Sequence, residues 1–155
     1  MRGRTARSGS GWIVLGEVEG QQVFNIGVVR SLRQFGEDVL ESRKRLNTAG
    51  STGDRTDIFV FNSLRDSAKG ANRDVIRDFV PGTDVIQLSG IDANATLNGD
   101  QAFSWSGQQA SAHGLWTVQS GANRLVRGDV DGDGIHDFEI QVNGVTSLTA
   151  DDFIL

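Results

Sequence analysis

The chain has 155 residues, of which 37% are hydrophobic, and it contains 20 glycines, one proline and no cysteine. The lack of cysteine excludes disulfides and thiolate-bound metals, and no apolar run approaches the roughly 18 residues of a membrane span, so no stable membrane insertion is expected. Residues 1–50 carry a net charge of +3 and residues 51–155 a net charge of −8. No nucleic-acid binding is expected of this acidic part, because such binding requires a basic face.

Residues 1–50 are interpreted as a leader before the main domain. Residues 1–11 are basic and rich in Gly and Ser, which predicts disorder. The apolar stretch from Trp12 to Leu15 is shorter than the core of a secretory signal peptide, so secretion through an N-terminal signal is not expected. One N-terminal helix is predicted over residues 27–46, because apolar residues recur there near helical spacings: Val28, Leu32, Phe35, Val39 and Leu46.

From Asp57 onward the sequence predicts short β-strands. Ile58–Phe61 is a continuous apolar run between polar turns, as expected of a strand that is buried on both faces. Similar short apolar segments follow at intervals of about ten residues: Val75–Ile76, Phe79–Val80, Val85–Leu88, Ala102–Trp105 and Leu115–Val118. Glycine is abundant and the one proline, Pro81, lies in a turn signal. The predicted fold class is all-β, as a sandwich or a roll.

The stretch Asp129–Asp137 carries four carboxylates around two glycines, between segments that alternate like strands. Calcium takes six to eight oxygen ligands, which alternate residues of one loop supply. The candidate ligands are Asp129, Asp131, Asp133, the backbone carbonyl of Ile135, and Asp137. The usual helix-loop-helix calcium hand is excluded, because Ile140 stands where that loop has its bidentate Glu. A plain hairpin turn is the alternative, since Asp and Gly favour turns without metal.

Five segments of the acidic part form a recognisable set: Asp57–Phe61, Arg73–Phe79, Gly82–Ser89, Gly128–Ile140 and Ala150–Leu155. In this order they resemble the C-terminal module of the serralysin family of secreted bacterial metalloproteases. The resemblance implies that residues 51–155 are a remnant of a parallel β-roll followed by a β-sandwich, which folds on binding calcium. It also implies an extracellular protein that a type I exporter recognises through an uncleaved C-terminal tail. Asp152–Leu155 fits that signal, and a last edge strand is the alternative interpretation of the tail.

The glycine-rich nonapeptide repeats that build such rolls and bind calcium between their turns leave only a degraded trace here, at Ala49–Asp57. At most the final turn of the roll is therefore expected. By analogy with the family, Asp57 and Asp74 are implied as further calcium ligands at the end of the roll. The alternative for both residues is a solvated carboxylate at a strand edge.

The proteases of this family bind catalytic zinc through H-E-x-x-H, in which two histidines lie on one helix face. This sequence has only His113 and His136, and neither lies in that pattern. A non-catalytic module is therefore expected. The alternatives are a truncated fragment of a secreted zinc metalloprotease, a hydrolase with paired carboxylates, and a carbohydrate- or surface-binding β-module. The last would use Trp12, Trp105 and Trp116 as stacking platforms, although aromatic residues on strands more often pack in the core.

Overall fold

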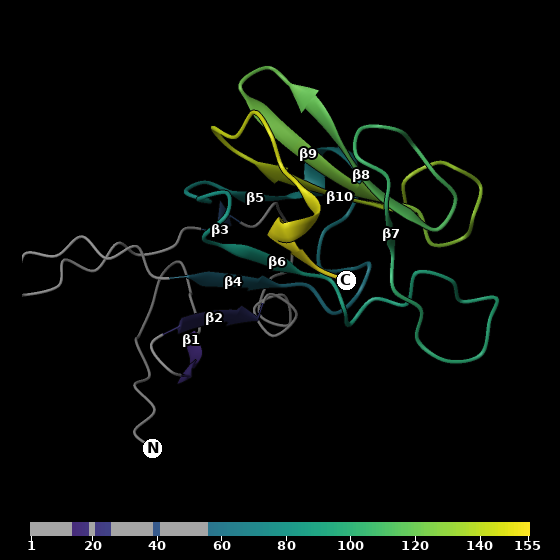
Figure 1. Ribbon diagram of the computed structural model, residues 1–155, viewed down its shortest axis with the longest axis horizontal. Helices are drawn as coiled ribbons and strands as arrows, with labels where there is room; N and C mark the ends of the chain where they lie inside the picture. The colour runs from purple at the N-terminus through teal and green to yellow at the C-terminus, as the bar shows by residue number, and fades with distance from the viewer. Residues whose placement is uncertain (1–13, 19–20, 26–38, 41–55) are drawn as a thin grey trace, which may run out of the picture.

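The computed structural model describes residues 14–18, 21–25, 39–40 and 56–155, which form two layered β-sheets (Figure 1). The strand order is β1-β2-β4-β6-β11 in the first sheet and β3-β5-β10-β9-β8-β7 in the second. The strands are β1 (Val14–Val18), β2 (Gln21–Asn25), β3 (Val39–Leu40), β4 (Asp57–Val60), β5 (Asp74–Ile76), β6 (Val85–Gln87), β7 (Ser104–Trp105), β8 (Gly114–Ser120), β9 (Asn123–Gly128), β10 (Phe138–Val142) and β11 (Phe153–Ile154). The described residues hold two short 3-10 helices, η1 (Gly70–Asn72) and η2 (Ala150–Asp152), and no α-helix. The all-β prediction is confirmed.

From β2 to β6 the chain passes alternately between the two sheets, as a parallel β-roll does. In the first sheet β2 pairs with β4 and β4 with β6, in each case in parallel. In the second sheet β3 pairs with β5 in parallel. After β6 the topology changes, because β8, β9 and β10 form an antiparallel meander within the second sheet. The last strand, β11, returns to the first sheet beside β6, so the predicted roll remnant followed by a sandwich is confirmed.

The helix predicted over residues 27–46 lies almost entirely outside the described residues. Its two described residues, Val39 and Leu40, form strand β3 instead and pair with Val75 and Ile76. The remaining residues of the predicted helix, 27–38 and 41–46, lie outside the described residues. At these two positions, therefore, pairing with β5 has overridden the local helical pattern.

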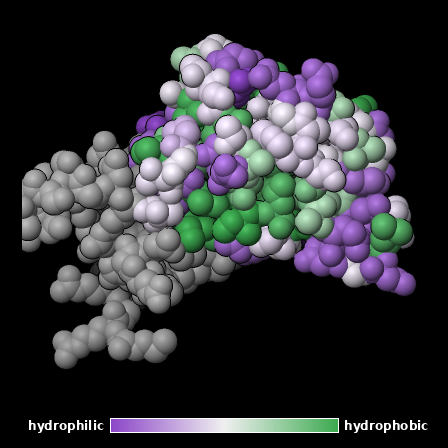
Figure 2. Space-filling model, viewed as in Figure 1, coloured by the Kyte–Doolittle hydropathy of each residue, from purple (hydrophilic) through white to green (hydrophobic). Residues whose placement is uncertain are grey.

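The core lies between the two sheets. Phe59, Ile86 and Phe153 occupy matching positions on β4, β6 and β11, and all three are buried. The second sheet contributes buried residues from its central strands: Ile76, Leu115, Val126, Phe138, Ile140 and Val142. In Figure 2 the apolar surface of the visible face gathers over β4, β6 and the C-terminal segment. None of the helices in the described part of the chain has the length and apolar character needed to cross a membrane.

Candidate metal-binding site

The acidic loop Asp129–Asp137 connects β9 to β10. Its base is closed by the N–H of Asp137, which donates to the carbonyl of Gly128 at 2.7 Å. Asp129 has a relative exposure of 0%. Its two carboxylate oxygens accept hydrogen bonds from the N–H groups of Gly132 and Gly134 at 2.7 and 2.6 Å. Both glycines have positive φ angles, of 84° and 80°, so the loop folds back over Asp129 in a way that other L-residues resist.

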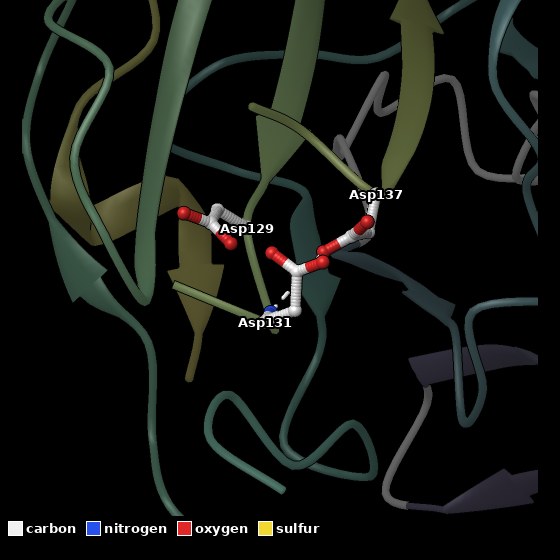
Figure 3. Close-up of side chains that lie close together, drawn as sticks. All are labelled: Asp129, Asp131 and Asp137. Atoms are coloured by element: carbon white, nitrogen blue, oxygen red, sulfur yellow. Dashed lines mark hydrogen bonds between the residues drawn. The ribbon is translucent and has the colours of Figure 1, made fainter. Parts of the chain in front are cut away.

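Three of the four loop carboxylates converge. Oxygens of Asp129, Asp131 and Asp137 lie within 4.8 Å of one another (Figure 3). Asp137 is oriented by the N–H of Val130, which donates to its Oδ2 at 2.8 Å. Calcium binds oxygen at about 2.3–2.6 Å, so the ligand oxygens of one ion lie at most about 5 Å apart. These three residues therefore fit a single calcium ion, and their all-oxygen chemistry suits a hard cation.

One of the predicted ligands in this loop, Asp133, lies apart from the other carboxylates, while the predicted ligand at Ile135 is its backbone carbonyl and stays a prediction. The carboxylate of Asp133 is outside the converging group and accepts the N–H of Ile135 at 2.7 Å. That hydrogen bond forms a local turn at the tip of the loop. The side chain of Ile135 points outward, with 60% of its surface exposed. The tip of the loop is thus shaped by Asp133, while the converging oxygens come from the two ends of the loop and from Asp131.

The structure does not bring Asp57 or Asp74 into this group. Asp57 lies on β4 in the first sheet and Asp74 on β5 in the second. The interpretation of both as solvated strand-edge carboxylates is wrong, because their exposures are only 6% and 0%. The N–H of Asp57 donates to Oδ1 of Asp84 at 3.0 Å, and the N–H of Asp74 donates to Oγ of Ser67 at 2.9 Å. Their roles as calcium ligands remain predictions from the family resemblance.

Sequence reasoning did not find Lys69, which lies beside the acidic loop. Its Nζ is 3.8 Å from Oδ1 of Asp137, and about half of its side chain is exposed. The ammonium group offsets part of the negative charge of the loop, although solvent screens this interaction. Lys69 directly precedes η1 and is distant from the loop in sequence, so no local signal links it to Asp137.

A second charged network lies next to the acidic loop and centres on Glu139. Although Glu139 is buried, its Oε2 accepts Nε and Nη2 of Arg127, each at 2.7 Å, and Nη1 of Arg73 lies 3.3 Å from Oε1. Nε2 of His136 is 3.6 Å from the same carboxylate. Burial lowers the pKa of His136 from 6.5, and the positive charge of Arg127 lowers it further, while Glu139 raises it. The folded state therefore favours neutral His136.

This lowered pKa predicts an acid-dependent loss of stability. In the unfolded chain His136 takes up a proton as the pH falls below 6.5, the ordinary pKa of histidine. The folded chain takes up that proton only at a lower pH, because folding lowers the pKa. Stability from this group is therefore present above that window and falls as the pH falls through it. Thermal melting of the wild type should drop more between about pH 7.5 and about pH 5.5 than that of His136→Asn. If the melting temperatures of the two proteins fell equally between these pH values, folding would not lower the pKa of His136.

The tryptophans do not form an exposed platform in the described residues. Trp116 has only 4% of its surface exposed. Trp105 is partly buried, and its ring centroid lies 5.1 Å from that of Phe153 in a tilted arrangement. Trp12 lies outside the described residues. Trp105 and Trp116 thus pack in or against the core, as aromatic residues on strands usually do.

Comparisons with known proteins place these features in a family. No curated protein sequence matches the chain. The solution structures of the AlgE6R3 and AlgE6R2 subunits of the Azotobacter vinelandii mannuronan C5-epimerase are similar, each at 22% identity and a TM-score of 0.45 over 77% of this chain. The chain spans 58% and 66% of those two structures, less than two thirds of each. A family model described as "Peptidase M10 serralysin C terminal" matches residues 5–155. The chain therefore belongs to the family of serralysin C-terminal domains of M10 peptidases.

Proposed function

We propose that this chain is a non-catalytic, calcium-binding C-terminal module of a secreted bacterial protein, which folds on binding calcium and carries a type I secretion signal. The observation that carries the proposal is the convergence of Asp129, Asp131 and Asp137 in a chain that belongs to the serralysin C-terminal family. The carbonyl of Ile135 and the carboxylate of Asp133 are the next candidates from the same loop. A non-catalytic role is supported by the family description, which names the C-terminal part of the peptidase.

Charge explains why the module would respond to calcium. Residues 51–155 carry a net charge of −8, and three carboxylates converge in one loop. In a cytosol with little free calcium, this repulsion disfavours the compact state. Outside the cell, an ion that binds only the folded chain stabilises it by RT ln(1 + [L]/Kd), about 1.4 kcal/mol per site at ten times Kd. Calcium would therefore shift a marginal domain toward its folded state after export.

Calcium titration of the full chain tests this proposal. Thermal melting should rise with calcium relative to chelator, and calorimetry should detect binding. Asp131→Asn is the sharpest probe, because Asp131 is exposed and its Oδ1 only accepts the N–H of Asp133 at 3.2 Å. Asparagine keeps an oxygen for that bond and removes the charge. We expect the variant to lose most of the calcium-dependent rise, while its stability in chelator stays within about 0.5 kcal/mol of the wild type.

The matched control is Asp100→Asn, which removes one exposed carboxylate from a different loop. It lowers the net negative charge by the same amount without touching the acidic loop. Its calcium response should equal that of the wild type. A melting temperature that is the same in chelator and in calcium for the wild type would disprove calcium-driven folding. If both variants lost the same part of the calcium response, the response would depend on the net charge of the chain and not on the acidic loop.

A further inference from the structure

His113 contacts the acidic loop from outside it and has an unusual backbone. Among the described residues it is the one non-glycine residue with a positive φ, of 54°. Histidine tolerates this region better than most residues, yet the conformation persists only where the surroundings fix it. The imidazole Nδ1 lies 2.9 Å from the carbonyl oxygen of Ala93 and 3.1 Å from that of Val130. Carbonyl oxygens only accept hydrogen bonds, so Nδ1 carries the proton and donates to both.

The imidazole also packs against Gly132. A Cβ atom at position 132 would lie 2.6 Å from Nε2 and 2.8 Å from Cε1 of His113, so no side chain fits there without displacing the ring. His113 thus holds Val130 by a hydrogen bond and Gly132 by contact, the residues on either side of Asp131. Gly132 is in turn the residue whose N–H donates to Oδ1 of Asp129. One side chain therefore constrains the segment that carries two of the three converging carboxylates.

We propose that His113 is a positioning residue for the calcium loop: it latches the Val130–Gly132 segment to the loop around Ala93 and so holds Asp129 and Asp131 ready for the ion. The inference rests on the proposed function of this loop. Without a bound cation, three carboxylates within 4.8 Å repel one another and favour an opened loop. A latch from outside the loop opposes that opening, and a site that is already formed binds its ligand more tightly.

Two substitutions separate the parts of this role. His113→Gly accepts the positive φ and removes both the donor and the ring. His113→Asn also tolerates that backbone, and its side-chain amide places a donor near the position of Nδ1. We expect His113→Gly to weaken calcium binding, measured by calorimetry with calcium alone, by about tenfold, as is typical when a residue that supports a metal ligand is removed. His113→Asn should recover most of that loss.

The comparison must distinguish positioning from general stability, so melting in chelator is measured for each variant. The proposal is supported if calcium affinity falls in His113→Gly by far more than its stability in chelator accounts for. It is overturned if His113→Gly binds calcium as tightly as the wild type, or if affinity and chelator stability fall together in both variants. If the wild type binds no calcium, the proposed function itself fails, which is a different result.

Nitrogen NMR of the wild type provides a test that needs no variant. The His113 ring should show a protonated Nδ1 both with and without calcium. Its signals should shift as calcium is added, with the same midpoint as the backbone signals of Asp131. Ring signals that stay unchanged while the loop signals move would overturn the proposal.

Discussion

Asp129→Ala is expected to lower the free energy of unfolding by about 3 kcal/mol in chelator and to abolish calcium binding at the acidic loop. Asp129 is fully buried, and both of its oxygens accept backbone N–H groups of the loop, those of Gly132 and Gly134. Hydrogen bonds to a charged acceptor are worth about 1.5–3 kcal/mol each, and alanine leaves both donors without that acceptor. Relief of repulsion from Asp131 and Asp137 offsets part of the loss.

Denaturant unfolding in chelator and calorimetry with calcium measure the two effects separately. Asp133→Ala is the matched control in the same loop, because its exposed carboxylate accepts a single N–H, that of Ile135. We expect it to cost about 1 kcal/mol. If Asp129→Ala and Asp133→Ala were equally stable, the buried carboxylate of Asp129 would not organise the loop as the structure indicates.

Sequence patterns predicted the strands that have a strong local signal. The apolar run at Ile58–Phe61 corresponds to β4, and the alternating residues after the acidic loop correspond to β10. Phe79 and Val80 are not in a strand, because the chain turns there and Asp84 accepts the N–H of Val80 at 2.8 Å. A short apolar pair does not by itself distinguish a strand from a buried turn.

The candidate site was predicted only in part, because a local pattern does not fix the direction of each side chain. Alternate spacing pointed to the loop in which three carboxylates converge, but spacing does not determine where each carboxylate points in a tight turn. Asp133 therefore bonds to the backbone at the tip instead of joining Asp129, Asp131 and Asp137. Lys69 and His113 reach the loop from other parts of the chain, and such contacts depend on strand pairing that local patterns do not contain. Both residues became apparent only from the tertiary structure.

The C-terminal tail is the second place where a single carboxylate should have a large effect. Asp152 has only 2% of its surface exposed. Its Oδ1 accepts the N–H of Gly82 at 2.7 Å, and its Oδ2 accepts the N–H of Thr149 at 2.7 Å. These bonds attach the tail to the turn before β6, and the carbonyl of Ile154 then accepts the N–H of Leu88 at 2.8 Å. In the folded chain the proposed export signal is thus part of the first sheet.

Asp152→Ala is therefore expected to destabilise the fold by about 3 kcal/mol, because two backbone N–H groups lose a buried, charged acceptor. Its exposed neighbour provides the control, and Asp151→Ala should change stability by no more than about 0.5 kcal/mol. Denaturant unfolding of the two variants in calcium gives the comparison. Equal stabilities would mean that the tail contributes little to the fold and that its contacts with Gly82 and Thr149 are not maintained in solution.

Asp152→Ala also separates the structural role of the tail from its proposed role in export. A type I exporter acts on an unfolded chain, so lost stability alone should not reduce the amount secreted. Phe59→Ala is the comparison variant. Truncating a buried phenylalanine lowers the free energy of unfolding by about 3–5 kcal/mol and leaves the amino-acid sequence of the tail unchanged. In a host with a type I exporter, we expect Asp152→Ala to lower secretion of the full chain and Phe59→Ala to leave it unchanged. If both variants were secreted like the wild type, Asp152 would serve the fold alone, and the signal would have to lie in other residues.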